Sequence, residues 1–365
     1  MSNHLSKILG CAIAIAFMAQ GPQTASAQKS RAQKLSQYSS ALLVATEHGV
    51  PADGKTDAAD AIQRLIDNNP NRTIFFPDGT YLVSRPILTP SDPKKSVDLV
   101  LANYAVMKAT TPWPGGAVVR LGALSPKFVI NENGSNYGLH GGIIDGSGVA
   151  DGVSIDGGRE TRIDNVSIKH THIGLHVKKA PQYSSSDADI CDVNIVGNDS
   201  ANSIGLLIEG FDNSFSNMRI ASVNVGVWSK SGGNSMRNIH PLYIFSPTQD
   251  YESSCGFVIE EDNNWMNYCY SDQFATGFLL KNNASSSFTD CYCYWYSGKV
   301  PFQTAIRCEK RFETVTNSFR ADFHNDCAKA TLLQVGEPGG KGTMQSQRQP
   351  AHALTADDVS KEYIK

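Results

Sequence analysis

The stretch GLLIE, residues 205–209, is one copy of a short pattern that recurs along the chain. A glycine followed by alternating apolar residues also opens GVSID at 152–156, GLHVK at 174–178, GVWSK at 226–230, GFVIE at 256–260 and GFLLK at 277–281, and AIRCE at 305–309 continues the series. Successive copies start 21 or 22 residues apart, or 28 to 31 residues apart where a loop is inserted near 181–189, 241–254 and 294–304. A period of this length is typical of a solenoid whose repeats are single coils. The alternation predicts strands whose first and third residues after the glycine point into the coil.

A second column of residues supports this alignment of the coils. Counting along each coil, an amide or carboxyl residue recurs at Asn165, Asp192, Asn217, Asn238, Asn267, Asp290 and Asn317. Asn and Asp favour turns, and at equivalent turns their side chains can bond to a neighbour or to backbone groups of the turn. We therefore expect a ladder of turn residues along the stack.

A third column stands four residues after each glycine and alternates in charge from coil to coil. Its members are Asp156, Lys178, Glu209, Lys230, Glu260, Lys281 and, in the coil that begins with alanine, Glu309. Adjacent strands lie roughly 4.7–4.9 Å apart, so opposite charges would face each other along one outer face. Slipping by one coil would place like charges together. We interpret this column as structural rather than as a site.

The segment ahead of the repeats contains a helix and two strands. In GVPADGKTDAADAIQRLIDNN, residues 49–69, Thr56 or Asp57 can cap a helix over 58–68 with an apolar stripe at helical spacing. Asn68, Asn69 and Pro70 end it. TIFFPDGTYLVSRPI, residues 73–87, then predicts two strands around an Asp-Gly turn.

These two segments together resemble the start of the pectate-lyase-like superfamily, in which a short helix plugs the N-terminal end of a single-stranded β-helix. GGIIDGSG, residues 141–148, is similar to a coil found in polygalacturonase-like members. The resemblance implies an all-β, right-handed parallel β-helix over residues 46–335, with helix 58–68 as its cap. It leaves the function open, because that fold hosts hydrolases, lyases, epimerases and phage tailspikes.

The two ends of the chain are expected to lie outside the β-helix. Lys7, the apolar run 8–19 and the small residues Ala25-Ser26-Ala27 predict a cleaved signal peptide, residues 1–27, and hence a secreted or periplasmic bacterial protein. Residues 28–45 form a polar leader. Residues 336–365 are rich in Gly, Gln and Pro at their start and are interpreted as a tail.

Composition narrows the classes of partner. A formal net charge of −3 with 18% charged residues does not favour nucleic acid as a partner. No segment after the signal peptide is apolar enough to predict membrane insertion. Cys11 lies in the signal peptide, and the other seven cysteines contain no Cys-x-x-Cys pair, which excludes a zinc ribbon. We expect buried thiols that act as small hydrophobic side chains.

Three histidines in seven positions, His170, His172 and His176, raise the possibility of a metal site. In the register above, however, His176 is an outward residue of the glycine strand, whereas His170 and His172 lie on another segment. Side chains on different sheets of a β-helix point in different directions, so we do not expect the three to converge and predict no metal site. His170 and His172 either line one rim of a groove or are solvated surface residues.

A functional site is predicted along one edge of the coils, at the position five residues after each turn residue. The residues at that place are His170, Gly197, Ser222, Tyr243, Asp272, Trp295 and Asp322, and near them lie His240, Tyr270, Gln273, Tyr292, Tyr294 and His324. The three inserted loops start from the same edge. Aromatic rings that pack on sugar rings, beside polar groups for their hydroxyls, are typical of glycan binding. The alternative is that CYCYWY, residues 291–296, is a strand whose aromatic side chains fill gaps.

The leading prediction is a polysaccharide-cleaving enzyme that uses Asp272 and Asp322. Two strand steps would place their backbones roughly 9–10 Å apart, and inverting glycosidases need carboxyl groups about 6.5–9.5 Å apart. Trp295, on the coil between them, would be the platform for the sugar ring. His324 would tune Asp322, and His240 is a further candidate catalytic residue. The alternative is that both are solvated turn carboxylates.

Two rival functions stay open. A polysaccharide lyase would take the proton beside a uronate carboxylate with a base and neutralise that carboxylate with Arg or Ca²⁺; its candidate residues are His240, His324, Arg320 and Tyr294. The other alternative is a non-catalytic glycan-binding or envelope protein. No other cofactor is expected. The predicted substrate-binding residues are Trp295, Tyr294, Tyr243, Tyr270, His170, His172 and Arg320. The motifs of polygalacturonases and of the first pectate lyases are absent, which makes pectin doubtful as the substrate. The expected partner is a polysaccharide or oligosaccharide, and the protein could be a monomer or a trimer.

Overall fold

The computed structural model describes residues 42–124, 135–297 and 300–347. The predicted signal peptide 1–27, the leader up to residue 41 and the end of the predicted tail, residues 348–365, lie outside the described residues. The predictions made for those segments therefore stay predictions.

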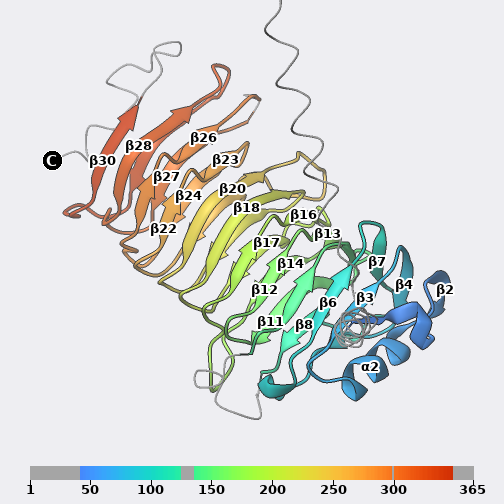
Figure 1. Ribbon diagram of the computed structural model, residues 1–365. Helices are drawn as coiled ribbons and strands as arrows, with labels where there is room; N and C mark the ends of the chain where they lie inside the picture. Colours follow the sequence, from blue (N-terminus) through green and yellow to red (C-terminus); the bar gives the residue numbers. More distant parts are fainter. Residues whose placement is uncertain (1–41, 125–134, 298–299, 348–365) are drawn as a thin grey trace, which may run out of the picture. The chain divides into compact units, whose positions relative to one another are not determined.

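From Val44 on, the described chain is a stack of coils whose strands pair in parallel with those of the preceding coil (Figure 1). The predicted all-β, right-handed parallel β-helix is confirmed. One face of each coil belongs to a ten-stranded sheet, which we call the glycine sheet because it contains the recurring glycine pattern. Its strands are β5 (Ile87–Leu88), β8 (Ala117–Gly122), β11 (Asp151–Gly157), β14 (Ile173–Val177), β17 (Ile204–Ile208), β19 (Val225–Ser229), β21 (Cys255–Ile259), β24 (Thr276–Leu280), β27 (Gln303–Cys308) and β29 (Ala330–Val335).

The rest of each coil adds strands to two further parallel ladders. The first ladder contains β3 (Thr73–Phe76), β6 (Asp98–Leu101), β9 (Gly138–His140), β12 (Arg162–Asp164), β15 (Asp189–Cys191), β18 (Ser214–Ala221), β20 (Ser235–Leu242), β22 (Trp265–Asn267), β25 (Ser287–Thr289), β28 (Val315–Asp322) and β30 (Thr343–Gln347). The second contains β2 (Asp53–Asp57), β4 (Gly79–Val83), β7 (Ala105–Ala109), β10 (Ile143–Asp145), β13 (Ser167–Thr171), β16 (Asn194–Gly197), β23 (Tyr270–Asp272) and β26 (Tyr292–Tyr294). The long strands β18, β20 and β28 bend and belong to both ladders.

The last described strand extends the stack beyond the boundary drawn from the sequence. β30 pairs in parallel with β28, with Val315 opposite Thr343. The coils therefore continue past residue 335, where we expected a tail to begin. Short elements complete the chain: β1 (Leu42–Val44) and the 3-10 helices η1 (Ala45–His48) and η2 (Pro93–Lys95).

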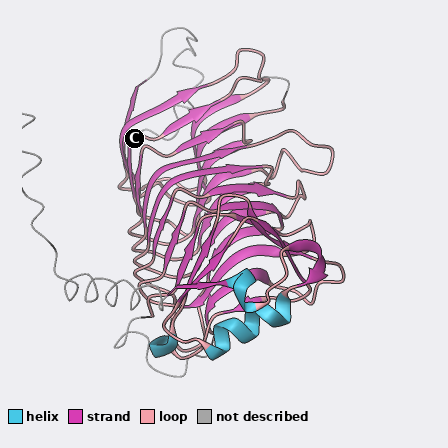
Figure 2. Cartoon of the chain, turned by 45° about the vertical axis from the view of Figure 1, so that its right-hand side comes forward, coloured by secondary structure: helices cyan, strands magenta, loops and turns pink. Residues whose placement is uncertain are grey.

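The predicted helix forms as α2 (Ala59–Asn68) and lies at the N-terminal end of the coils, where it packs on β4 and β5 (Figure 2). Ile62, Leu65 and Ile66 are buried. The N-cap residue is Ala58 rather than the predicted Thr56 or Asp57, but Asp57 supports the start of the helix, since its Oδ1 accepts a hydrogen bond from the Ala59 N–H at 3.0 Å. Burial opposes ionisation of Asp57, but hydrogen bonds from Ser84 and from the Ala59 N–H outweigh it and lower its pKa.

Inward side chains stack in columns through the coils, as the alternation predicted. Val153, Leu175, Leu206, Val227 and Phe257 are fully buried at equivalent places of successive coils, and the Phe257 and Phe278 rings stack with centroids 4.7 Å apart. The glycine that recurs in this sheet reflects close approach. A Cβ on Gly174 would lie 2.6 Å from the Gly205 carbonyl oxygen and 2.4 Å from Ile195 Cγ2, so no larger residue fits without displacing backbone.

Between the first and second ladders the chain turns at one residue with left-handed backbone. These residues, which we call the turn row, are Asn165, Asp192, Asn217, Asn238, Tyr268, Asp290 and Ser318, with φ between 53° and 57°. Five of the seven were predicted. Asn267 and Asn317 were wrong by one residue, because they pair with Thr289 in the first ladder and the turn falls on Tyr268 and Ser318. Asn238 Nδ2 donates to Asn217 Oδ1 at 2.9 Å, as a turn ladder requires.

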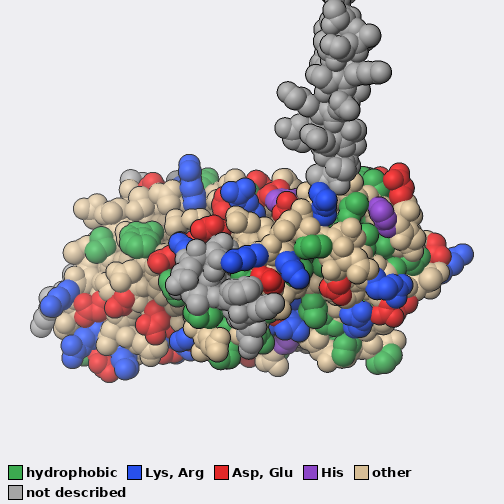
Figure 3. Space-filling model, turned by 60° about the horizontal axis from the view of Figure 1, so that its bottom comes forward, with side chains coloured by type: hydrophobic (Ala, Val, Ile, Leu, Met, Phe, Trp, Pro, Cys, Tyr) green, Lys and Arg blue, Asp and Glu red, His purple; other side chains and the backbone are tan. Residues whose placement is uncertain are grey.

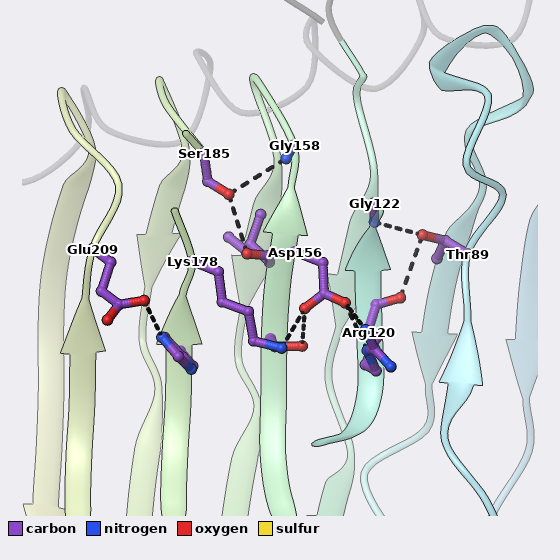
Figure 4. A network of polar contacts seen from close by, with 11 residues as sticks. Thr89, Arg120, Gly122, Asp156, Gly158, Lys178, Ser185 and Glu209 are labelled. Atoms are coloured by element: carbon purple, nitrogen blue, oxygen red, sulfur yellow. Dashed lines mark hydrogen bonds and ion pairs between the residues drawn. The ribbon is translucent and has the colours of Figure 1, made fainter. Parts of the chain in front are cut away.

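The alternating charges form ion pairs along the outer face of the glycine sheet, and Figure 4 shows Asp156, Lys178 and Glu209 at one end of this ladder. Lys178 Nζ lies 2.8 Å from Asp156 Oδ1, and the corresponding distances are 3.3 Å for Lys230–Glu209 and 3.2 Å for Lys281–Glu260. The ladder is less exposed than predicted at one end, because the Asp156 side chain is 1% exposed and is also paired with Arg120. On the face shown in Figure 3, acidic and basic side chains are likewise interspersed.

The cysteines of the described chain are free thiols, and five of them are buried: Cys255, Cys269, Cys291, Cys293 and Cys308. Cys269, Cys291 and Cys293 lie at inward places of their coils, as predicted, and burial raises the pKa of Cys269 to about 12. In the described residues, none of the helices has the length and apolar character needed to cross a membrane.

Candidate functional site

The register of the second ladder places the two predicted carboxylates in one column. Asp272 of β23 is paired with Tyr294 of β26, and Tyr294 is paired with Asp322 of β28. These are orange to red strands toward the C-terminal end of the stack in Figure 1. Two parallel strand steps separate the aspartates, which corresponds to roughly 9–10 Å between their backbones. The predicted spacing thus follows from the observed pairing, with Tyr294 as the residue between them.

Trp295 and Tyr243 do not belong to this outer face, and their predicted substrate-binding roles are wrong. Trp295 is 3% exposed, its indole N–H donates to the Phe274 carbonyl oxygen at 2.7 Å, and its ring stacks on Phe323. Tyr243 is 1% exposed and packs edge-on against Phe274. Trp295 and Tyr243 stand five residues after their turn residues, whereas Asp272 and Asp322 stand four residues after the true turn residues Tyr268 and Ser318. The one-residue error at those two turns had placed all four residues in one column, but a difference of one residue puts side chains on opposite faces of a strand.

Asp272 is held beside an aromatic pair. The Nε2 atom of His240 lies 3.4 Å from Asp272 Oδ2, and the His240 ring stacks on Tyr270 with centroids 3.7 Å apart. The other carboxyl oxygen, Oδ1, is buried and has no hydrogen-bond partner among the described residues. Burial raises the pKa of Tyr270, so its hydroxyl stays protonated near neutral pH. The Asp272 side chain is therefore a half-buried carboxyl group with one close donor candidate.

Asp322 sits in a different environment. Arg320 pairs with it through Nη2 and Nε, the Nη2–Oδ2 distance being 2.5 Å, and the Tyr292 hydroxyl donates to Oδ2 at 2.6 Å. The guanidinium also lies over the Tyr292 ring, 4.9 Å from its centroid. The hydrogen bond to Asp322 raises the pKa of Arg320. For Tyr292, burial and then the hydrogen bond to Asp322 raise the pKa. Both effects favour Asp322 as the charged carboxylate.

A row of tyrosines crosses the site. It runs along the chain from Tyr268 to Tyr270, passes to Tyr292 in the next coil, and continues along the chain to Tyr296. Neighbouring ring centroids lie 6.3 Å apart for Tyr268–Tyr270 and for Tyr270–Tyr292, 6.0 Å for Tyr292–Tyr294 and 6.2 Å for Tyr294–Tyr296. Tyr268, Tyr294 and Tyr296 are exposed. We call these five residues the tyrosine track. It supplies the aromatic surface that we had assigned to Trp295.

The histidines named from the sequence occupy separate places. His324 lies two residues beyond Asp322 and its Nδ1 accepts a hydrogen bond from the Asp326 N–H at 3.1 Å. His170 contacts Asp145 at 3.0 Å, and His172 lies 3.5 Å from the Ser200 hydroxyl. His176 pairs with Glu209 at 3.0 Å, and burial lowers its pKa. The three do not converge, as expected, and His170 is four coils from Asp272, roughly 19 Å along the stack.

No metal centre emerges from the described part of the chain, which contains no group of three or more His, Cys, Asp or Glu placed to hold an ion. Of the tyrosine track, the repeat pattern indicated no role for Tyr292 and did not point to Tyr268 or Tyr296. The sequence did contain another signal for Tyr292 and Tyr296. In YCYWY, residues 292–296, tyrosine alternates with other residues, so one face of a strand must carry three tyrosines. Tyr268 was hidden because tyrosine is unusual at a left-handed turn.

Comparison with known families places the sequence in context. The profile of the family described as "Rhamnogalacturonase A/epimerase, pectate lyase-like" matches residues 44–240, which is more than half of the chain. No curated protein matches the sequence.

Three solved structures illustrate the likeness in fold. ORF18 of Geobacillus virus E2 has a TM-score of 0.62 at 18% identity and covers 90% of this chain and 65% of its own. A tailspike protein of E. coli bacteriophage HK620 has a TM-score of 0.61 at 11% identity, with 87% and 65% covered. The endo-xylogalacturonan hydrolase from Aspergillus tubingensis has a TM-score of 0.56 at 14% identity, with 87% and 97% covered. The chain thus spans 65% of the length of the two viral proteins, and at these identities the likeness concerns the fold.

Proposed function

Because the chain belongs to the rhamnogalacturonase A/epimerase, pectate lyase-like family, we propose that it is an enzyme that hydrolyses a polysaccharide with Asp272 and Asp322. The observation that carries the proposal is their shared column, two coils apart, with the exposed Tyr294 between them. Side-chain lean from a backbone spacing of roughly 9–10 Å reaches the range of about 6.5–9.5 Å used by inverting glycosidases. A sugar ring on Tyr294 would lie between the two carboxyl groups.

The surroundings assign a role to each aspartate. Arg320 and Tyr292 favour the charged form of Asp322, which suits the residue that accepts a proton from the attacking water. Asp272 is then the residue that protonates the departing sugar oxygen. His240, 3.4 Å from Asp272 Oδ2, is placed to orient that carboxyl group and to return its proton after each turnover.

The lyase alternative is supported less well by the same contacts. A lyase needs a base and a cation for the uronate carboxylate, but Arg320 is already paired with Asp322. Burial raises the pKa of Tyr270, Tyr292 and Tyr296, which opposes their use as bases. His240 remains a possible base. A non-catalytic glycan-binding protein would use the tyrosine track without needing either aspartate.

The test begins with a screen of the purified protein against a panel of polysaccharides, with release of reducing ends as the readout. For the substrate found, Asp272→Asn and Asp322→Asn should each lower turnover by a factor of about 10² or more while the fold is retained. Glu309→Gln, a charge on another face, is the matched control and should retain turnover. Near-normal turnover in both aspartate variants would refute the proposal, and an ultraviolet-absorbing unsaturated product would identify a lyase.

We also propose that the protein is exported, because residues 1–27 have the charged start, apolar run and small-residue cleavage site of a signal peptide. Expression of the full chain in a bacterium, followed by fractionation and mass determination, tests this. A periplasmic or secreted product that begins at Gln28 is expected. An uncleaved chain that stays in the cytoplasm would contradict it.

A further inference from the structure

Beside the proposed catalytic column, the turn row is hollowed on its outer side. Two adjoining hollows of about 490 and 470 Å³ share Asn217 and Asn238. The first also contains Arg237 and Tyr268, and the second also contains Arg219. This surface shares Tyr268 with the tyrosine track but contains neither Asp272 nor Asp322, and the proposed hydrolytic mechanism assigns it no role.

Two guanidinium groups stand on either side of the shared asparagines. Arg219 follows the turn at Asn217, and Arg237 precedes the turn at Asn238 in the next coil. Arg219 Nη1 is held by the carbonyl oxygens of Met218 and Asn238 at 3.1 and 3.3 Å, which leaves its other nitrogens available. Arg237 has no hydrogen-bond or ion-pair partner within the described residues. The hollows also contain two acidic residues, Asp192 in the coil before Asn217 and Asp290 two coils beyond Asn238.

The asparagines between the arginines add a directed donor. Asn238 Nδ2 donates to Asn217 Oδ1 at 2.9 Å, and this bond fixes the orientation of the Asn217 amide. The Nδ2 group of Asn217 therefore remains free to donate to a ligand. Two guanidinium groups and one amide donor around a small hollow are suited to an oxyanion such as a carboxylate or a sulfate.

Aromatic rings extend this surface in the next coil. Tyr268 is 58% exposed and Trp265 is 53% exposed, although a large aromatic side chain is usually buried. Trp265 pairs with Ser235 and lies two residues from Asn267, the partner of Arg237, so it is on the same outer face as Arg237. Sugar rings pack their C–H faces on exposed aromatic rings of this kind. Tyr268 also keeps a left-handed backbone, φ 53°, where other coils have Asn, Asp or Ser.

We propose that Asn217, Arg219, Arg237, Trp265 and Tyr268, the acidic-sugar site, bind a negatively charged sugar residue of the glycan. Its carboxylate or sulfate lies between Arg219 and Arg237, and its ring packs on Tyr268 or Trp265. The proposal rests on the proposed function for the identity of the ligand as a glycan. Tyr268 and Tyr270 are neighbours in the tyrosine track, 6.3 Å apart, so a chain bound here leads over the turn toward Asp272.

The experiment measures binding apart from cleavage. Calorimetric titration of the Asp272→Asn protein uses oligogalacturonate, oligomannuronate and a sulfated galactan oligosaccharide as probes. Each is paired with a neutral counterpart, the methyl ester or the desulfated form. Arg237→Gln, Trp265→Ala and Tyr268→Asn are compared with Arg307→Gln and Tyr104→Ala, which change an exposed arginine and an exposed tyrosine elsewhere.

We expect at least one charged probe to bind, and its neutral counterpart to bind on the order of tenfold more weakly. Arg237→Gln should weaken binding of the charged probe by a similar factor and leave the neutral probe unchanged. Trp265→Ala and Tyr268→Asn should weaken both. The carboxylate and sulfate probes separate the two sources of charge.

Several results would overturn the proposal. They are binding of no charged probe, equal binding of charged and neutral forms, or equal losses in the site variants and the two controls. Conversion of an oligomer to a monomer by Trp265→Ala would identify the surface as a contact between copies of the chain instead. Loss of binding in Arg237→Gln together with full turnover in Asp272→Asn would refute only the hydrolytic mechanism.

Discussion

The outer face of the glycine sheet and the outer face around the turn row use charge in opposite ways. On the glycine sheet, Lys178 meets Asp156 of the neighbouring coil (Figure 4). Lys230 and Lys281 likewise each meet a carboxylate of the neighbouring coil. Around the turn row, Arg237 has no partner in the described part of the chain, and aromatic side chains are exposed. Both faces belong to the same coils, so the fold itself does not impose the difference. Regular, mutually paired charges indicate support of the stack, whereas unpaired charges beside exposed rings indicate a surface for a ligand.

The largest effect is expected at the buried end of the charge ladder. Asp156→Asn leaves Arg120 and Lys178 without their shared carboxylate, and loss of one member of a buried ion pair costs about 3–5 kcal/mol. Urea denaturation should therefore show a much lower free energy of unfolding. Glu309→Gln, at the exposed end of the ladder, should change it by less than about 0.5 kcal/mol. Equal losses in the free energy of unfolding for Asp156→Asn and Glu309→Gln would show that burial does not determine how much each charge of the ladder contributes.

The same carboxylate predicts an acid dependence. Burial opposes ionisation of Asp156, but hydrogen bonds from Lys178 and Ser154 and the charges of Lys178 and Arg120 lower its pKa. A lowered pKa in the folded state contributes stability that is complete above the unfolded value of about 3.9. That stability is lost as the pH falls through the lower folded value. The difference between native protein and Asp156→Asn should therefore shrink on acidification, and a constant difference would contradict the ion-pair explanation.

A smaller effect of opposite sign is expected on the turn row. Tyr268→Asn places at the left-handed turn the residue found at Asn217 and Asn238, and should stabilise the fold by about 1 kcal/mol. The reciprocal change Asn165→Tyr should destabilise it by a similar amount. Thermal or urea denaturation measures both. Stabilisation combined with weaker glycan binding would show that Tyr268 is retained for binding, and destabilisation by Tyr268→Asn would show that it supports the stack.

A small loss of stability is expected near the exposed end of the ladder, at the ladder residue before Glu309. Lys281→Gln removes a partly exposed ion pair with Glu260 and should cost about 0.2–1 kcal/mol. The loss should decrease in high salt, because exposed charges are screened. A salt-independent loss would mean that packing of the lysine chain near Trp228, rather than its charge, accounts for the effect.

Sequence periodicity was sufficient to predict the coils, but not to predict which residues lie at the turn row and on the outer face beside it. The glycine strands could be aligned because Gly174 and its equivalents are required by close backbone approach and repeat with the apolar columns. The turn row could not be aligned throughout, because Asn267 stands next to the true turn residue, Tyr268, and offers the more usual side chain. In the run 291–296 both faces carry aromatic residues, so alternation alone did not distinguish the buried Trp295 from the exposed Tyr294.

The unpaired groups could not be predicted either. Arg237 and Lys178 are both cations at outward places in their coils, and the sequence shows no difference in kind between them. The difference is the distance to a carboxylate in the next coil, which depends on which columns become neighbours in three dimensions. Asp272 and Asp322, by contrast, were separated correctly because their spacing depends only on the number of coils between them.

Because spacing depends on the number of coils, the stack allows only certain distances between residues of one column. Residues of one column can be separated only by whole strand steps of about 4.8 Å, so one step gives the roughly 5 Å of retaining glycosidases and two steps approach the spacing of inverting ones. Asp272 and Asp322 are two strand steps apart, with Tyr294 at the step between them. For the proposed hydrolase, deletion of the coil between the two aspartates would therefore give the spacing of retaining enzymes in a single discrete event, whereas substitutions could only adjust the site within its class.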